Sequence, residues 1–215
     1  MSSGLDLAVV DQLLSTTRAV RRRLDFSRPV EREVLLDCVR LSQQAPTASN
    51  QQTWRWLIVT DPAKKAQLGE IYSRGRPAML KSAEEAVQGE EQTRRVYDAA
   101  FWLADKIAEA PALVIPCAVG RPPETFSPIL SSTIYGSIVP AIWSFQLALR
   151  SRGLGSCFTT VHLFWEDEVR ALFGIPEDVL QVAMLPVAYT VGTDFKPAVR
   201  PAPESICYWD AWASE

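Results

Sequence analysis

The chain has 215 residues, with 22 Lys and Arg against 25 Asp and Glu, a formal net charge of −3, and 47% hydrophobic residues. This length fits one domain of ordinary size or at most two small ones, and the composition excludes disordered and collagen-like chains. The near-neutral charge argues against a nucleic-acid partner. No apolar run reaches the roughly 18 residues of a membrane span, and the start lacks the basic residues of a signal peptide. We therefore expect a cytoplasmic protein.

Apolar residues at helical spacing predict two helices near the start, at 5–16 and 31–43. Pro46 ends the second helix, because the residue before a proline disfavours helical geometry. Residues 54–59 (WRWLIV) then predict a strand, and a helix is expected at 63–72.

The apolar pattern weakens from 73 to 92, where Gly75, Pro77 and Gly89 stand among charged residues. Glycine and proline interrupt regular structure most strongly. We expect a solvated connector here, and the most mobile or variable part of the chain.

The following segments are strongly apolar. They predict a helix at 93–109, a strand at 112–119, a loop at RPPE (121–124), a helix at 133–152, a strand at 156–161, a helix at 165–173 and a strand at 179–189. The helix at 133–152 carries few charges on any face, so it should lie in the centre of the structure. The expected fold class is α+β, with helices around a small sheet.

The last segment, 193–215, has a different character. Prolines keep it extended and aromatic side chains supply apolar surface: Pro197, Pro201, Pro203, Tyr208, Trp209 and Trp212. An extended tail with aromatic anchors needs a surface to lie on. It could fold back on its own domain or embrace a partner subunit.

Metal and nucleophile chemistry have little support in the sequence. The four cysteines form no C-x-x-C pair, and His162 is the single histidine. A zinc site needs about four closely placed ligands, so we expect no metal. Cys38 and Cys117 lie inside apolar runs and are expected to be small core residues.

Four arginines form the first candidate binding group: Arg18, Arg21, Arg22 and Arg23. A guanidinium stays ionised at any working pH and matches phosphate geometry, so the group is a candidate anion site. The alternative is a solvated basic turn, because charge runs usually lie on the surface.

Two further segments are candidates. The polar loop 45–54 (APTASNQQTW) gathers hydroxyl and amide groups that suit a heteroaromatic ring, although turn residues at a capped helix end have the same composition. The segment 153–156 (GLGS) turns a helix into a strand, and its glycines permit close approach to a flat ligand. A glycine that ends a helix is the commoner explanation.

Taken in order, these motifs resemble the nitroreductase family of flavoenzymes over essentially the whole chain. The Arg-rich opening RAVRRRLDFSRPVEREVL comes first, followed by APTASNQQTW, by GLGS after a long apolar helix, and by the tail KPAVRPAPESICYW. The resemblance implies a nitroreductase-like fold with a small, mostly antiparallel sheet. It also implies a single FMN-binding domain over 1–215, in which 193–215 wraps a partner.

The resemblance also implies the FMN contacts, residue by residue. Basic residues hold the phosphate and the ribityl chain, the polar loop and GLGS lie near the ring, and no metal is used. The implied contacts are Arg18, Arg21, Arg22, Pro46, Thr47, Asn50, Gln52, Gly153, Gly155, Ser156 and Arg200. Two positions depart from the pattern: Ala19 replaces a serine, so one ribityl hydroxyl contact is missing or replaced, and Thr53 replaces a proline.

The implied reaction is ping-pong hydride transfer. NAD(P)H reduces the flavin, which then reduces a nitroaromatic, quinone or similar electron-poor acceptor in the same cavity of a homodimer. Flavin N5 carries the chemistry, so no catalytic side chain is required and solvent supplies protons. Two alternatives remain. One is a specialised flavin enzyme of the same fold, a dehalogenase or a flavin-fragmenting enzyme, and the other is a flavin-binding protein without turnover.

Overall fold

The computed structural model describes residues 4–86, 91–123 and 125–212. The described chain divides into two units. The larger unit spans residues 18–193, and the smaller one joins residues up to 17 with those from 194. We describe each unit by itself.

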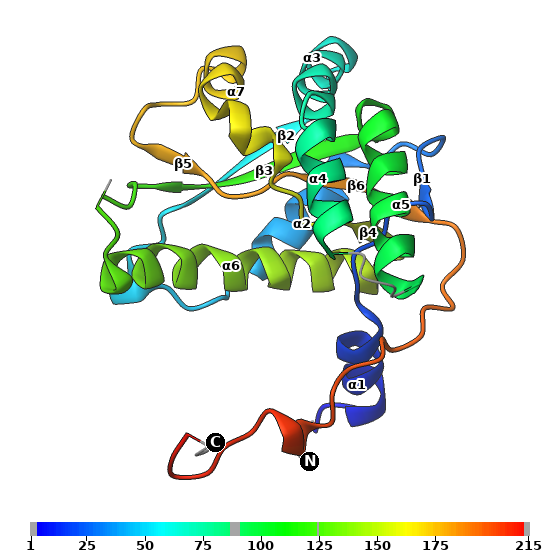
Figure 1. Ribbon diagram of the computed structural model, residues 1–215, viewed down its shortest axis with the longest axis vertical. Coiled ribbons are helices and arrows are strands. Elements are labelled where there is room, and N and C mark those ends of the chain that lie inside the picture. Colours follow the sequence, from blue (N-terminus) through cyan, green and yellow to red (C-terminus); the bar gives the residue numbers. More distant parts are fainter. Residues whose placement is uncertain (1–3, 87–90, 124, 213–215) are drawn as a thin grey trace. The chain divides into compact units, whose positions relative to one another are not determined.

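The larger unit is built on a six-stranded sheet in which every strand pair is antiparallel. The central strands are β3 and β6, which pair with each other. Strand β3 also pairs with β2 and β5, and β6 also pairs with β1 and β4 (Figure 1). The strands are β1 (Leu24–Asp25), β2 (Trp54–Val59), β3 (Ala112–Val119), β4 (Leu154–Ser156), β5 (Val179–Gln181) and β6 (Leu185–Thr190).

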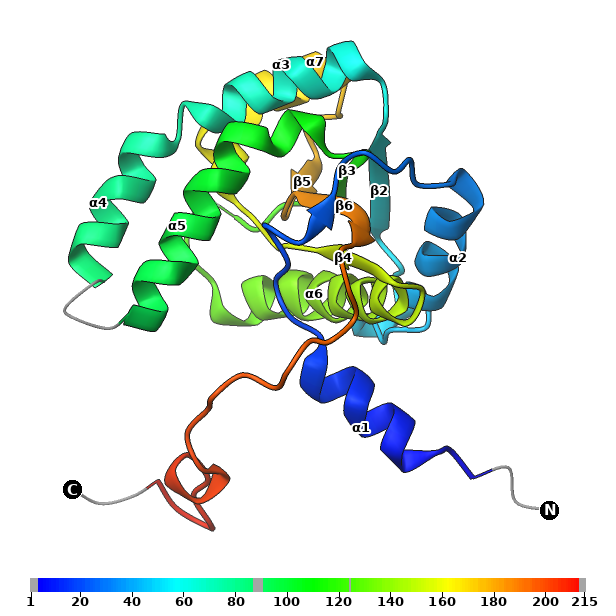
Figure 2. The same ribbon diagram turned by 90° about the vertical axis from the view of Figure 1, so that its right-hand side faces the viewer.

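Helices cover both faces of this sheet because β3 is apolar on both of its faces. Val114 and Ala118 pack on one side with α2 (Arg32–Ser42) and α6 (Pro128–Ser151). Leu113 and Ile115 pack on the other side with α3 (Pro62–Ser73) and α5 (Glu91–Lys106). Helix α7 (Glu166–Phe173) belongs to the second layer (Figure 2). The predicted α+β class is confirmed.

Most predicted elements of this unit are confirmed within a few residues. Strands β2 and β3 have the bounds that the sequence predicts, and helices α2, α3 and α7 differ by one residue at most at each end. Helix α5 begins two residues early and ends at Lys106, after which Ile107–Glu109 forms a 3₁₀ turn.

The prediction of a connector at 73–92 is wrong for most of its length. Helix α4 occupies Arg76–Ala86, and residues 87–90 lie outside the described part of the chain. Pro77 is the second residue of α4, where a proline is tolerated because its missing N–H is unpaired anyway. Gly75 is buried, and a Cβ atom there would meet Val161 Cγ1 at 2.1 Å. This glycine therefore serves close packing and does not loosen the chain.

Helix α6 begins five residues before its predicted start, at Pro128, with the Ser127 hydroxyl as its N-terminal cap. It continues through Pro140 to Ser151. Of the RPPE loop that precedes it, Glu124 lies outside the described residues. In the part of the chain that the structure describes, no helix is long and apolar enough to cross a membrane.

Two strand predictions are wrong in detail. The strand predicted at 156–161 is β4, which begins two residues earlier and already ends at Ser156; beyond it, within the predicted range, Thr159 makes an isolated bridge with Met184. The strand predicted at 179–189 is divided into β5 and β6, which pair with different parts of the sheet. The two-residue strand β1 was not predicted, because two residues carry no periodic signal.

The smaller unit contains α1 (Leu7–Thr16), whose first turn is capped by the Asp6 carboxylate. Its C-terminal part has no regular structure before the short 3₁₀ turn Pro203–Ser205, as expected for a proline-rich segment. The rings of Tyr208 and Trp212 contact each other at a tilt of 31°, with centroids 4.5 Å apart. Residues 213–215 of the predicted tail lie outside the described residues.

His162 lies fully buried in the larger unit, in the 3₁₀ turn Val161–Trp165. Among the described residues, neither ring nitrogen has a hydrogen-bond partner. Burial lowers the pKa of His162 to about 4, against a smaller opposing effect of the nearby Glu166 carboxylate. The imidazole is therefore neutral in the folded protein at any pH near 7.

This burial predicts an acid-sensitive fold. The folded pKa lies below the ordinary value of about 6.5, so between pH 6.5 and 4 the unfolded chain binds the extra proton and stability falls as the pH falls. Above pH 6.5 this effect leaves the free energy of unfolding unchanged, and by pH 4 it has lowered that free energy by roughly 3 kcal/mol. Chemical denaturation of the parent and of His162→Phe across this range measures the difference. Parallel pH profiles for the two proteins would contradict the assignment.

Candidate functional site

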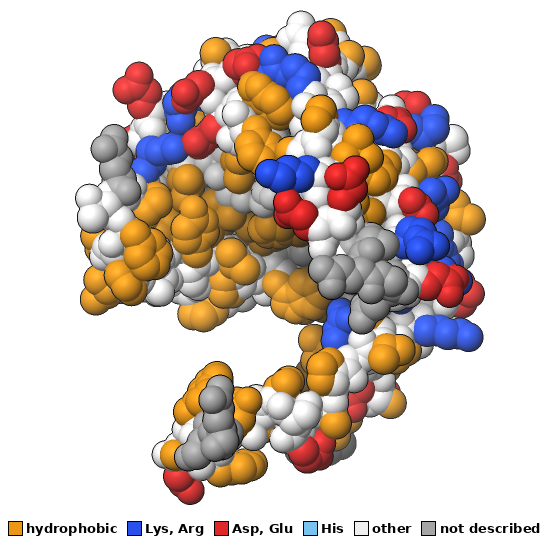
Figure 3. Space-filling model, in the orientation of Figure 1, with side chains coloured by type: hydrophobic (Ala, Val, Ile, Leu, Met, Phe, Trp, Pro, Cys, Tyr) orange, Lys and Arg blue, Asp and Glu red, His pale blue; other side chains and the backbone are white. Residues whose placement is uncertain are grey.

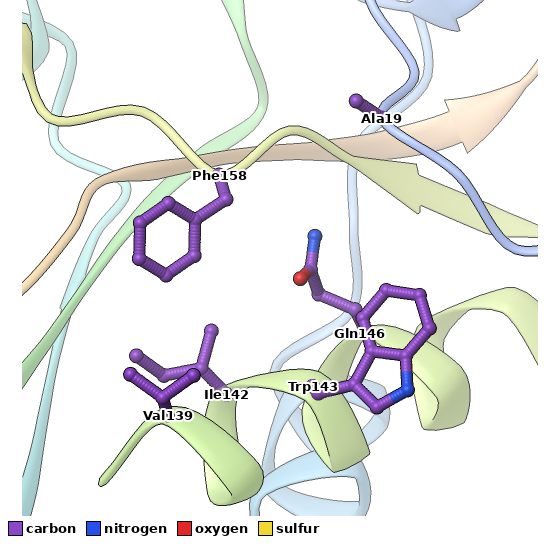
Figure 4. A pocket seen from close by; sticks show the side chains of 6 residues that line it. All are labelled: Ala19, Val139, Ile142, Trp143, Gln146 and Phe158. Carbon is purple, nitrogen blue, oxygen red and sulfur yellow. The ribbon is translucent and has the colours of Figure 1, made fainter. Parts of the chain in front are cut away.

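A pocket of about 360 Å³ opens between α6 and two chain segments that run above it (Figure 4). Four of its residues lie on α6 at the spacing i, i+3, i+4 and i+7, which places them on one helix face. The lining is Ala19, Val139, Ile142, Trp143, Gln146 and Phe158. The pocket is mostly apolar and suits a flat, largely apolar ring.

A smaller cavity of about 180 Å³ shares Phe158 with the first pocket. Its walls come from α3, α4, α5 and residues 158–161, and it contains the Arg21 side chain. Burial raises the pKa of Tyr72 in its wall to about 12, while the Thr159 hydrogen bond and the Arg21 charge act in the opposite direction. A guanidinium and three hydroxyl-bearing residues, Tyr72, Thr159 and Thr160, thus stand beside the apolar pocket.

The four arginines do not act as one cluster. Arg18 is exposed, next to Ala19 of the larger pocket, and Arg21 lies in the smaller cavity. Arg22 donates a hydrogen bond to the carbonyl of Asp98 on α5, at 3.3 Å. Arg23 donates to the carbonyl of Val191, at 2.8 Å. Two of the four side chains are therefore engaged in holding residues 18–24 to the rest of the fold.

The GLGS segment holds residues 18–21 beside the sheet. The Val20 amide donates to the carbonyl of Ser156 at 2.8 Å. A Cβ atom on Gly155 would meet Thr190 Cγ2 at 2.8 Å and Val20 Cβ at 3.0 Å, so Gly155 permits close packing within the chain. Gly153, with φ +76°, ends α6 in the left-handed conformation typical of a C-terminal glycine.

The polar loop after α2 has a strained backbone. Ser49, Asn50 and Gln52 all have φ between 50° and 54°, a region that costs a non-glycine residue free energy. Gln52 stabilises the loop with two hydrogen bonds: its side-chain amide donates to Asn50 Oδ1 at 3.0 Å, and its backbone N–H donates to Thr47 Oγ1 at 3.3 Å. The loop, which follows Pro46, therefore presents the exposed Asn50 and Gln52 amides in a fixed conformation.

This loop and GLGS contact opposite sides of α6. The Ala48 amide donates to Ser137 Oγ, and the Gln146 side chain donates to Ser156 Oγ, each at 3.0 Å. Residues 137 and 146 of a helix are about 14 Å apart along its axis and half a turn apart around it. The structure therefore does not bring Asn50 and Gln52 together with Ser156 in one chain.

Arg200 belongs to the smaller unit, where its side chain is exposed and donates to the carbonyl of its neighbour Val199 at 3.2 Å. Its predicted phosphate contact stays a prediction. Sequence reasoning missed five of the six pocket residues, Val139, Ile142, Trp143, Gln146 and Phe158. Gln146 offered a signal, because it is a lone amide within the apolar run of α6.

The buried thiols do not offer a nucleophile at neutral pH. Burial raises the pKa of Cys38 to about 11 and that of Cys117 to about 12, and burial also raises the pKa of Cys157. Cys38 and Cys117 are core residues, as predicted. Over residues 4–86, 91–123 and 125–212, no three His, Cys, Asp or Glu side chains gather in a way that could hold a metal.

Comparisons with known proteins give consistent results. Iodotyrosine deiodinase of Thermotoga neapolitana is 28% identical over 176 residues, which cover 82% of this chain and 86% of that protein. A crystal structure of oxidized iodotyrosine deiodinase bound to FMN and 3-iodo-L-tyrosine is 26% identical, with a TM-score of 0.70 over 94% of this chain and all of that one.

More distant structures share the fold alone. The FMN-dependent nitroreductase NfnB from Mycobacterium smegmatis, solved in complex with NADPH, is 18% identical, with a TM-score of 0.68 over 96% of this chain and all of that one. Residues 14–189, which include all of the sheet except its last residue, Thr190, and the helices that cover it, match the Nitroreductase family. The chain belongs to the Nitroreductase family.

Proposed function

We propose that this chain is a cytoplasmic, homodimeric oxidoreductase that binds FMN and uses NAD(P)H to reduce nitroaromatic, quinone or similar electron-poor small molecules. The observation that carries the proposal is the apolar pocket on α6, flanked by the Arg18–Arg21 segment in a chain of the Nitroreductase family. An oxidoreductase of this class needs an apolar cleft for the flavin ring and cations for its phosphate. This pocket offers apolar walls, and Arg21 lines the cavity that shares Phe158 with it.

The residues present fit FMN. Arg18 and Arg21 supply positive charge for a dianionic phosphate, and the walls of the pocket are apolar enough for a tricyclic ring. When bound, FMN supplies a ring that accepts and returns two electrons. The role of the protein is then to hold the phosphate, to orient the ring and to exclude water on the α6 side.

The protein side chains near the pocket do not exchange protons readily at neutral pH. His162 is buried and neutral, and the raised pKa of Tyr72, about 12, keeps its phenol protonated. The Cys157 thiol is protonated for the same reason, burial. This supports a reaction in which solvent supplies the protons.

The exposed apolar surface of α6 supports the homodimer in this proposal, because a second copy of the chain would cover it and complete the site. Helix α6 exposes apolar side chains, among them Ile129, Tyr135, Val139 and Trp143, and Figure 3 shows hydrophobic side chains gathered along it. A two-fold partner could bring its own Thr47–Gln52 loop to the pocket of the first chain. The tail 193–215 carries Trp209 and Trp212, both more than 80% exposed, which suit a role in wrapping the partner.

A second candidate function is reductive dehalogenation of a halogenated phenol. Two iodotyrosine deiodinases at 28% and 26% identity favour it. The BluB-like flavoprotein of Clostridium difficile 630 is 17% identical and shows the fold alone, so it adds no support for flavin fragmentation. Turnover with NADH or NADPH against p-nitrobenzoate, menadione and 3-iodo-L-tyrosine separates the two candidate reactions. A flavin-loaded protein whose flavin is not bleached by either nicotinamide would be a binding protein without turnover.

The proposal predicts that the protein purifies with FMN and that Arg18→Ala or Arg200→Ala weakens the binding. A charge-assisted contact to phosphate contributes roughly 1.5–3 kcal/mol, so affinity should fall about ten- to a hundredfold. Titration followed by flavin fluorescence measures this. Arg40→Ala, on the exposed face of α2 beside Asp37, serves as the control and should bind like the parent. Equal affinities in all four proteins would remove the phosphate assignment.

The shared site predicts complementation between two defective variants. Arg18→Ala alters one contributor, and the double variant Asn50→Ala/Gln52→Ala alters the other. Co-expressed with different tags, they form a mixed dimer in which one site contains both changes and the other site is intact. We expect about half the flavin content and turnover of the parent dimer, well above either variant alone. A mixed dimer no better than the variants would show that each site lies within one chain.

A further inference from the structure

Gln146 is a polar side chain in an otherwise apolar wall. It lies on α6, is 8% exposed, and lines the larger pocket together with Val139, Ile142 and Trp143. Figure 4 shows its amide extending from α6 between Phe158 and Trp143 towards Ala19, with the oxygen on the side of Phe158. The amide therefore reaches the part of the pocket nearest the Arg18–Arg21 segment.

The NH₂ group of the Gln146 amide makes a hydrogen bond within the protein. Its Nε2 donates a hydrogen bond to Ser156 Oγ at 3.0 Å, which fixes the amide in orientation. Among the described residues, the Gln146 side chain makes no other hydrogen bond. Its carbonyl oxygen Oε1 is turned to the pocket. Leucine or methionine would fill the same space, so an amide at this position of the wall calls for a polar partner in the pocket.

The position of the free acceptor suggests which group it meets. Ala19 stands across the pocket from Gln146, and Arg18 precedes it in the sequence. If Arg18 holds a phosphate, the next atoms of FMN towards the ring are the ribityl hydroxyls, which are O–H donors. A carbonyl oxygen accepts from an O–H group and repels a phosphate oxygen, so it suits the ribityl chain and not the phosphate.

We propose that Gln146 Oε1 accepts a hydrogen bond from a ribityl hydroxyl of FMN and so replaces the contact that a serine at position 19 would make. The inference rests on the proposed FMN function. Ser156 acts as a positioning residue, because its hydroxyl holds the other end of the amide. In this chain the polar contact to the ribityl group would therefore come from α6, on the side of the pocket that faces position 19.

The test compares three flavins that differ in the ribityl and phosphate groups. FMN has both, riboflavin lacks the phosphate, and lumiflavin lacks the ribityl chain as well. Dissociation constants are measured with the full chain, stripped of flavin, for the parent and for Gln146→Met, a substitution of similar volume without hydrogen-bonding groups. We expect FMN and riboflavin to bind about three- to tenfold more weakly to the variant, and lumiflavin to bind equally to both proteins.

A rescue variant adds a second measurement. Ala19→Ser in the Gln146→Met background supplies a hydroxyl from the opposite wall and should recover most of the lost FMN affinity. An equal loss for all three flavins would place the contact on the ring, and no loss for any would leave Gln146 a structural residue; either result overturns the inference. Failure of the serine to recover affinity would overturn the equivalence of the two contacts. A parent protein that binds no flavin would instead refute the proposed function.

Discussion

Helix α6 is apolar around most of its circumference, and this is the constraint on which the rest of the structure depends. One side is buried by the sheet and α2 through Ile138, Phe145 and Leu149. The sheet can cover only one side of a helix, so Val139 and Trp143 remain about 40% exposed. A 24-residue helix with two apolar sides is therefore both the centre of the fold and the floor of a binding pocket.

The same helix separates the parts of the candidate site. It holds the Thr47–Gln52 loop through Ser137 and the GLGS segment through Gln146, on opposite sides and about 14 Å apart along its axis. One small ligand cannot reach both in a single chain. Under the proposed function, a partner copy would cover the exposed side of α6 and supply the missing half of the site, so cofactor binding would depend on association.

The interior around the pocket is arranged to keep ionisable groups neutral. Burial lowers the pKa of His162 and raises that of Tyr72, so that both are uncharged at pH 7. The permanent charges are guanidinium groups at the edge, such as that of Arg21. A site of this kind is suited to binding a charged cofactor and to transferring electrons, and less suited to acid–base catalysis.

The sequence by itself determined the fold class, the strands at 54–59 and 112–119 and the family, because periodicity and ordered motifs are local properties of the chain. It misread 73–92, since Gly75 and Pro77 suggest a loop unless the neighbour Val161 is known. Only the tertiary structure placed Gln146 opposite Ala19, engaged Arg22 and Arg23 elsewhere, and separated Asn50 from Ser156. Those relations depend on which side of α6 faces the sheet, and that is decided by packing between residues far apart in the sequence.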